Sequence, residues 1–470
     1  MKKIISAKLP ILLLLIIIVF NSNAQTKAQK GRKIFGKTIE RINPVNGLIR
    51  CVSTEYEEYL KGKISKRATT NEFETWIAPK VELMKQRLQT ANTPNVVIIP
   101  VVVHVIHNGD ALGVNENISE DRILSQITVL NQDFRKLINT PGYNSNAIGA
   151  DVEIEFCMAQ VDPEGNATSG IHRVNLGVAS WSTEASVEGI LKPQTIWDPE
   201  QYFNIWVCQF SSSQSAELGG VLGYAQFPSN SGLGGLNIDG GDANTDGVII
   251  DYRCFGSSDY VTGTYFSGYD KGRTATHEIG HCFGLRHIWG DNSSCTINTT
   301  DSYKDYCPDT PAASTENYDC LSVYNSCTTA TGNDMTENYM DYTNDTCMNT
   351  FTLDQKARIL AVLENSPRRA TLVTSTVCSS TSLGNSTNSF QNEVSIYPNP
   401  ANDVLNISLG GSSNLPKAYS IYNNLGQLIT QETISSTADL SINTSDFSSG
   451  IYFIRIEKEN AVKTLKFLKK

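Results

Sequence analysis

The stretch HEIGHCFGLRH, at residues 277–287, places three histidines around one acidic residue. Its first two histidines are four residues apart, so on a helix both imidazoles project from the same face. The glycine that follows can end the helix and let the third histidine approach from a new direction. Three protein ligands leave one position open for water, which is the arrangement of a catalytic zinc. The stretch therefore predicts His277, His281 and His287 as zinc ligands, and Glu278 as a base that reaches the water without binding the metal.

A second element of the same kind follows, where NYMDY occupies residues 338–342. A methionine in a tight turn beneath three zinc-binding histidines accompanies the long histidine motif in zinc proteases. Met340 lies 53 residues after His287 and fits this role. The alternative is that these histidines are structural and are satisfied by hydrogen bonds. In that case three of the chain's six histidines would fall into one motif by chance alone.

Around the motif, strands and helices are mixed in the way of an α+β protein. The β-branched run VVIIPVVVHVI at residues 96–106 predicts a buried strand. Ser119 is a candidate N-cap for an amphipathic helix that continues to Leu137. Further strands are expected at 152–161, 202–210, 221–227 and 248–252, a terminal helix at 351–363, and long disulfide-held loops at 293–338.

The net charge of −10 is unevenly distributed. Residues 1–94 carry 17 Lys and Arg against 7 Asp and Glu, residues 95–390 carry 14 against 34, and residues 391–470 carry 7 against 7. The strongly acidic middle argues against a nucleic-acid partner, and it favours basic partners or cations such as calcium.

The N-terminal residues predict export. A lysine-rich start, an apolar run at 9–20 and a small-x-small site at 22–24 are typical of a signal peptide over residues 1–24. That run is too short to span a membrane core of ~30 Å, and no later segment is long and apolar enough to do so. Residues 25–94 are basic and polar, with a helix expected at 72–88 and too few apolar residues for a core, so we expect a prosegment before a catalytic domain at 95–378.

Ten of the 11 cysteines lie between Cys157 and Cys378, and Cys51 stands alone. An even set of cysteines in an exported chain predicts disulfides, whose connectivity the sequence leaves open.

The end of the chain differs in character. Residues 379–392 form a polar linker, and residues 393–470 alternate short β runs with turns, which predicts a small all-β sandwich.

Residues 95–378 resemble the pappalysin-type metzincins, also called cytophagalysins. The resemblance rests on IPVVVHVIH, on HEIGHCFGLRH with the following IWGD, on DYCPDTPA and on NYMDYTNDTCMNTFT. It implies a metzincin-like α+β domain, with a mixed sheet and helices above a zinc cleft and an irregular part below. Substrate is expected beside an edge strand within 219–227.

The resemblance also implies roles for single residues. Glu278 moves a proton from water to the leaving amine, and Tyr342 helps to hold the zinc site and the developing oxyanion. The disulfides Cys295–Cys327 and Cys320–Cys347 are implied for the lower part. Cys282 and Cys307 depart from the family pattern, and they either pair with each other or remain buried thiols.

Two further sites follow from the resemblance. Asp345 matches the family's specificity aspartate and favours Arg or Lys after the scissile bond; the alternative is a solvated loop aspartate. Asp305, the carbonyl of Pro308 and Thr310 match a Ca²⁺ site beside the cleft, although loop turns also use such residues.

The remaining polar clusters are interpreted as structural. His104 and His107 are three apart on a strand, so they point to opposite faces and cannot form one site; His172 is likewise expected to be structural. The acidic run at 239–246 could bind a second calcium, but its spacing favours a solvated turn.

The C-terminal residues resemble the sorting domain of the type IX secretion system in VSIYPNPANDVLNI, IYNNLGQLI and GIYFIRI. This resemblance implies passage across an outer membrane with the type IX machinery as partner. The alternative is a carbohydrate-binding or adhesion sandwich.

Together these features predict a secreted or cell-surface zinc endopeptidase that cuts protein or peptide substrates and is made as a latent zymogen. The alternatives are a surface adhesin with a non-catalytic metal site and a metallo-hydrolase for non-protein substrates.

Latency is assigned to Cys51, because a thiolate can fill the zinc position that water needs. Arg50 is expected near acidic residues of the cleft, and the activating cut between Lys61 and Thr93. An idle thiol, or a disulfide to the catalytic domain, remains the alternative for Cys51.

Overall fold

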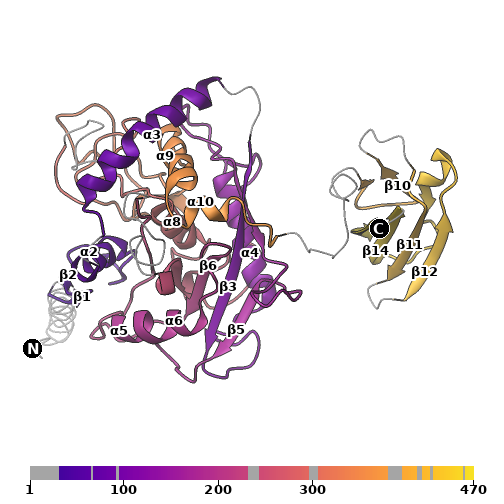
Figure 1. The fold of residues 1–470 in the computed structure, drawn as a ribbon, viewed down its shortest axis with the longest axis horizontal. Coiled ribbons are helices and arrows are strands. Elements are labelled where there is room, and N and C mark those ends of the chain that lie inside the picture. The colour runs from indigo at the N-terminus through magenta and orange to yellow at the C-terminus, as the bar shows by residue number, and fades with distance from the viewer. Residues whose placement is uncertain are drawn as a thin grey trace, which may run out of the picture. The chain divides into compact units, whose positions relative to one another are not determined.

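The structure is a computed structural model that describes residues 31–64, 67–90, 95–230, 243–295, 305–378, 394–409, 415–423, 427–458 and 461–470. The chain divides into two compact units, Met1–Ser380 and Thr381–Lys470 (Figure 1). The predicted signal peptide and linker lie outside the described residues. Among the described helices, none combines the length and the apolar character needed to cross a membrane.

A six-stranded sheet forms the centre of the first unit. Its strands are β3 (Val97–His107), β4 (Ile154–Met158), β5 (Ile171–Asn175), β6 (Phe203–Cys208), β7 (Gly223–Ala225) and β8 (Val248–Asp251). The order is β4-β3-β6-β8-β7, and β5 also pairs with β3. All pairings are parallel except that β7 runs antiparallel to β8. The edge strand expected within 219–227 is therefore present as β7.

Helices around this sheet position the catalytic motif. Ser119 caps α4 (Glu120–Phe134) by accepting a hydrogen bond from the Arg122 amide at 3.3 Å, as predicted. Thr352 and Gln355 form a capping box at the start of α9 (Leu353–Asn365). The motif helix is α8 (Arg273–Cys282). Shorter helices are α5 (Glu184–Ser186), η1 (Val187–Leu191), α6 (Lys192–Thr195), η3 (Ala243–Thr245), η4 (Tyr252–Cys254), η5 (Asp345–Cys347) and α10 (Arg369–Leu372).

Residues 31–90, here called the N-terminal segment, have no separate core. The segment contains β1 (Lys33–Ile34), β2 (Lys37–Thr38), α2 (Ser53–Lys63) and α3 (Thr70–Thr90). The buried face of α3 joins the same hydrophobic core as β3 and α8. In Figure 1, α3 runs along α9, with which it makes extensive contacts. The predicted helix at 72–88 is confirmed, and the shortage of apolar residues is explained by this packing.

The cysteines only partly follow the expected pairing. Cys295–Cys327 and Cys320–Cys347 form disulfides, as the resemblance implied, and a third joins Cys157 to Cys378. The possible pairing of Cys282 with Cys307 is wrong, because both are free and buried in different surroundings. The Cys282 sulfur accepts a hydrogen bond from Arg369, and Cys208 and Cys254 are also free thiols inside the core.

Two of the structural interpretations can be followed in the fold. His104 is fully buried, with Nδ1 2.9 Å from Nδ1 of His172 and Nε2 2.8 Å from Oδ1 of Asn204. Asp246 is not a solvated turn residue, since it is buried in an ion pair with Arg369 at 2.7 Å and a second with Arg368. The rest of the acidic run up to residue 242 lies outside the described residues.

The second unit is all β. One sheet has the order β13-β10-β9, from β9 (Ser395–Tyr397), β10 (Val404–Ser408) and β13 (Ser441–Asn443). The other has the order β12-β11-β14-β15, from β11 (Ala418–Asn423), β12 (Leu428–Thr433), β14 (Gly450–Lys458) and β15 (Ala461–Lys469). A short helix, η6 (Thr437–Leu440), precedes β13, and one apolar core includes residues of both sheets.

Candidate active site

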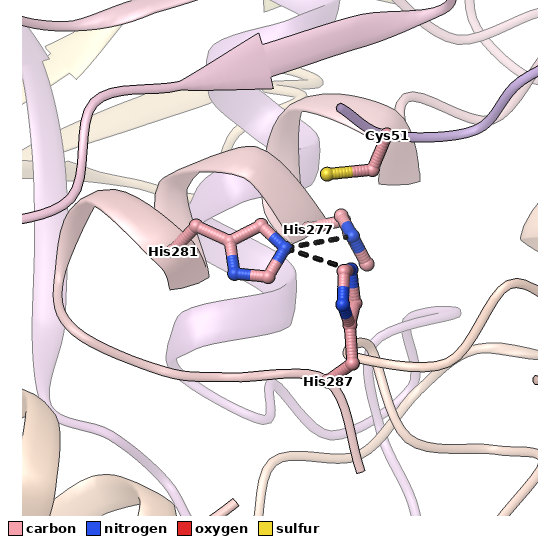
Figure 2. A group of neighbouring side chains, drawn as sticks. All are labelled: Cys51, His277, His281 and His287. Atoms are coloured by element: carbon pink, nitrogen blue, oxygen red, sulfur yellow. Dashed lines mark hydrogen bonds between the residues drawn. The ribbon is translucent and has the colours of Figure 1, made fainter. Parts of the chain in front are cut away.

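The histidine motif lies on α8 and on the turn that follows it. Gly284 has a φ of 93°, and a Cβ there would lie 2.7 Å from Val362, so the turn requires glycine. After the turn His287 returns toward the helix. Nε2 of His281 then lies 3.1 Å from Nε2 of His277 and 3.0 Å from Nε2 of His287 (Figure 2).

The partners of the other ring nitrogens fix how these histidines are protonated. Nδ1 of His277 lies 2.7 Å from the Tyr339 carbonyl oxygen, and Nδ1 of His281 lies 2.8 Å from that of Leu285. A carbonyl oxygen only accepts, so each Nδ1 carries the proton and each Nε2 presents a lone pair. Burial, together with the neighbouring histidines, lowers the pKa of both rings well below the usual value.

Unprotonated Nε2 atoms at this spacing repel one another unless a cation lies between them. Nδ1 of His287 completes the pattern, because it lies 2.5 Å from Oδ1 of Asp291 and donates to that carboxylate. Three imidazoles, each oriented through Nδ1 and grouped through Nε2, are the donor set that zinc prefers. The site therefore fits Zn²⁺.

The predicted methionine turn lies directly against the motif helix. A Cβ on Gly280 would approach the sulfur of Met340 to 2.5 Å, so the helix and the turn can pack this closely only with glycine at that position. The preceding residue, Tyr339, supplies the carbonyl that orients His277. The turn thus packs against α8 and orients His277, and it contributes no metal-binding atom.

Glu278 is completely buried beside the histidines, and burial raises its pKa to about 8. Its Oε2 accepts a hydrogen bond from the Ser53 hydroxyl at 2.7 Å, while Oε1 has no hydrogen-bond partner among the described residues. The Ser53 hydroxyl also accepts from the Ala225 amide of β7 at 2.8 Å. Ser53 therefore joins the carboxylate to the edge strand.

Cys51 lies over the three histidines. Its sulfur and one nitrogen of each imidazole all lie within 4.8 Å of one another, and Figure 2 shows the side chain next to the histidines. The Tyr342 hydroxyl donates to the Cys51 carbonyl oxygen at 3.4 Å, and the Tyr342 and His287 rings are 4.9 Å apart. Sequence reasoning expected both residues at the zinc site, and the structure brings them together beside the three histidines.

Asp345, the first residue of η5, is buried next to the start of α8. Its Oδ2 accepts from the amides of Lys271 at 2.9 Å and Arg273 at 3.2 Å, and its Oδ1 lies 3.2 Å from Nη1 of Arg50. The Arg50 guanidinium also lies over the ring of Tyr269, at 5.1 Å. The solvated-loop alternative for Asp345 is wrong, because the residue is 1% exposed and its carboxylate accepts from two amides at the start of α8.

The candidate calcium residues share one loop. Asp305 accepts from the Cys307 amide at 3.0 Å and from the Thr310 hydroxyl at 2.8 Å, and Pro308 lies on the surface between them. Asp305 and Thr310 thus contact each other, and calcium binding in this loop stays a prediction.

Several residues at the site were missed by sequence reasoning. Asp291 belongs to the IWGD stretch that carried the resemblance, and its spacing of four from His287 was the available signal. Ser53 had no signal, because its partners Glu278 and Ala225 are remote in sequence. Glu74 of α3 also had no signal; it accepts hydrogen bonds from Arg358 and Arg286 of the catalytic domain.

A three-histidine zinc site with a buried glutamate, supported by a methionine turn and bordered by an edge strand, defines a metzincin-type metalloprotease. Residues 190–364 match the family profile described as pregnancy-associated plasma protein-A, and residues 395–470 match that of a secretion system C-terminal sorting domain.

Several known proteins are similar to this chain. An extracellular metalloprotease of Verticillium alfalfae is 30% identical over 56% of this chain and 74% of its own length. One from Sordaria macrospora is 37% identical over 30% of this chain, and the aligned region spans less than half, 44%, of that protein. Mature mirolysin of Tannerella forsythia, solved with a cleaved peptide, is 38% identical over 60% of this chain and 96% of its own, with a TM-score of 0.49.

The chain belongs to the pappalysin family of metallopeptidases, the family of pregnancy-associated plasma protein-A. It is a zinc metalloendopeptidase with a type IX sorting domain, and it is secreted or displayed at the cell surface. The alternative of an adhesion sandwich at the C-terminus is not supported, since that unit matches the sorting domain along its length.

Proposed function

We propose that this chain is the latent precursor of an endopeptidase that cuts peptides before Arg or Lys. One observation carries the proposal: the dipeptide Arg50-Cys51 lies across the site, with the guanidinium on Asp345 and the sulfur over the histidines. The N-terminal segment thus occupies both the specificity pocket and the metal position. The roles below rest on this geometry.

The residues that hold zinc are His277, His281 and His287. Bound there, zinc supplies a Lewis acid that makes water a competent nucleophile at neutral pH. Glu278 takes the proton of the attacking water and delivers it to the leaving amine. Its Oε1, which has no hydrogen-bond partner among the described residues, is the atom available for this transfer.

Tyr342 is positioned to stabilise the developing oxyanion. Its hydroxyl already donates to a peptide carbonyl at the site, that of Cys51. A substrate carbonyl in that place receives the same hydrogen bond, which strengthens as negative charge develops on the oxygen.

Asp345 selects the residue that follows the scissile bond. Its carboxylate is buried and is held by two backbone amides, so its position is fixed before a substrate arrives. A guanidinium or ammonium group of the substrate replaces that of Arg50, through a charge-assisted hydrogen bond.

The N-terminal segment blocks the edge of the sheet as well as the metal. The Ile49 amide donates to Gly220 at 2.9 Å, the Leu222 amide donates to Ile49 at 2.9 Å, and the resulting bridge is parallel. A substrate that adds to this edge must displace the segment. Activation therefore needs a cut between Lys61 and Thr93, after which the segment leaves.

The function is tested with purified precursor and activated enzyme on casein and on a peptide library. We expect cleavage before Arg and Lys by the activated form only, loss of cleavage with a zinc chelator, and recovery when zinc is returned. Chelator-resistant cleavage, or equal cleavage before Leu and Arg, contradicts the proposal.

A further inference from the structure

A cluster of buried charges lies where α3 meets the catalytic domain. Glu74 of α3 accepts two hydrogen bonds from Arg358 of α9, both at 2.7 Å, and one from Nε of Arg286 at 3.2 Å. The side chains of Glu74 and Arg358 are 7% and 2% exposed, so this contact is shielded from solvent. The two arginines, one of them inside the histidine motif, thus share a single carboxylate.

This cluster lies on the far side of the metal position from the Asp345 pocket. Asp345 is bonded to the amides at the start of α8, whereas His281 lies in the last turn of that helix. Phe227 contacts the ring of His281 at 5.1 Å, and the Arg286 guanidinium lies over the ring of Phe227 at 5.3 Å. If the Asp345 pocket receives the residue after the scissile bond, Arg286 lies beside the residues before it.

The two contacts of Phe227, with His281 and with Arg286, also limit the distance between Arg286 and the metal position. They place Arg286 within about 10 Å of the His281 ring, which is roughly three residues of extended chain. The end of the edge strand is close as well, because the Phe227 carbonyl accepts from Arg67 of the N-terminal segment at 3.0 Å. A small cavity at the same junction is lined by Phe227, Arg286 and residues of the segment.

The N-terminal segment supplies the carboxylate that these arginines bind. Although burial disfavours the charged form of Glu74, Arg358 and Arg286 hold its pKa below the usual value. Asp291 of the catalytic domain is also near Arg286, but its Oδ1 is bonded to His287. When the segment leaves, both guanidinium groups lose Glu74.

We infer that Arg286, backed by Arg358, forms a subsite of the activated enzyme that selects a Glu or Asp side chain two to four residues before the scissile bond. Glu74 then acts in the precursor as an internal stand-in for that acidic side chain, just as Arg50 stands in for the basic one. The inference rests on the proposed function, because it needs cleavage before Arg or Lys and release of α3. The substrate class becomes peptides with an acidic residue shortly before a basic one.

The test uses activated wild-type enzyme whose new N-terminus has been sequenced. Pairs of peptides with one Arg at the cleavage position differ only in Glu or Gln at two, three or four residues before the bond. We expect kcat/KM about tenfold higher for Glu than for Gln at one of these positions, as for a charge-assisted hydrogen bond. Added salt lowers this ratio.

Matched variants assign the effect to Arg286. In Arg286→Gln the Glu-to-Gln ratio falls to near one, and Arg286→Lys keeps part of it. Arg286→Glu is assayed with one further peptide that has Lys at the same position, and it cuts this Lys peptide faster than the Glu peptide. Arg135, which pairs with Asp151 and Glu155 on another part of the domain, provides the control variant Arg135→Gln with an unchanged ratio.

The outcomes separate the inference from the proposed function. Cleavage before Arg with equal kcat/KM for all Glu and Gln peptides overturns the subsite and leaves the proposed function standing. An N-terminus showing that α3 is retained also overturns the subsite. Failure to cut any of the peptides overturns the proposed function itself. If Arg286→Gln does not fold, the salt dependence of the wild-type ratio decides.

Discussion

Asp291 accepts a hydrogen bond from Nδ1 of His287 at 2.5 Å, whereas His277 and His281 have backbone carbonyls as their Nδ1 partners. The third ligand is therefore the one oriented by a charged side chain. It also lies after a turn and not on the helix, so its position depends most on such a partner.

We predict that Asp291→Ala weakens zinc binding by roughly 10- to 100-fold, because His287 loses the group that fixes its tautomer and raises its basicity. Competition with a chromophoric chelator on the activated enzyme measures this directly. Asp162→Ala, in a surface turn, is the control. Equal zinc affinity in the two variants would show that the backbone alone holds His287.

Removing the base separates chemistry from metal binding. We predict that Glu278→Ala lowers turnover at least ~10²-fold, because the attacking water loses its proton acceptor. Zinc content, measured by mass spectrometry of the purified protein, stays at one per chain, since Glu278 is not a ligand. Near-normal turnover would mean that another group takes the proton.

Substitution of Asp345 tests specificity with little change of shape. Asp345→Asn keeps an acceptor for the amides of Lys271 and Arg273 but removes the charge. We predict that the preference for Arg over Leu after the scissile bond falls about tenfold or more, as expected for loss of a charge-assisted hydrogen bond. Mass spectrometry of a digested peptide library gives the preference, and an unchanged profile would place the specificity elsewhere.

Cys51 is tested in the uncleaved precursor. In a Glu278→Ala background, which prevents self-cleavage, we expect X-ray absorption to show one zinc–sulfur distance of about 2.3 Å that disappears in Cys51→Ala. Cys51→Ala with Glu278 intact should show activity before any cut. If both precursors are equally latent and neither has a zinc–sulfur bond, blockage by the segment alone explains latency.

His104 should make the stability of the protein depend on pH. Burial, with His172 nearby, lowers the pKa of His104 from 6.5 to about 3, so the folded protein keeps it neutral. Below pH 6.5 the unfolded chain binds a proton that the folded one does not, and stability therefore falls as pH falls. We expect this residue alone to cost up to roughly 2 kcal/mol between pH 7 and 5.

Urea unfolding of wild type and His104→Gln at pH 7 and pH 5 measures the effect. His172 contacts His104 and also titrates, so the variant His172→Gln is measured under the same conditions. The loss between the two pH values should be smaller in His104→Gln. An equal loss in all three proteins would show that other groups set the acid stability.

Much of the fold, and the grouping of the three histidines, could be predicted because their signals are local. The helical periodicity and the N-cap Ser119 predicted α4. The β-branched run at residues 96–106 predicted that β3 is a buried strand. The approach of the three histidines follows from the spacing of two of them on one helix and from the glycine turn before the third. By contrast β5 was missed, since its five residues, IHRVN, are only partly buried and show no alternation of apolar and polar residues.

Contacts between remote parts of the chain could not be predicted in this way. The Ser53–Glu278 and Glu74–Arg358 pairs join residues more than 200 positions apart, and no local pattern marks them. The overall charge gave a basic segment before an acidic domain. The buried contacts run in both directions, with Arg50 on Asp345 and Glu74 on Arg358.

The disulfide between Cys157 and Cys378 has a mechanical consequence. Cys378 is the last described residue before the sorting domain, and Cys157 lies in β4 at an edge of the sheet. A pulling force on the chain beyond Cys378 is therefore transmitted through the disulfide to β4. It is not transmitted through α10 and α9. The disulfide forms outside the reducing cytoplasm. Once it has formed, a pull on the sorting domain, or its removal by cleavage, puts no force on these two helices. The turn at Gly284, which packs on Val362 of α9, is protected in the same way.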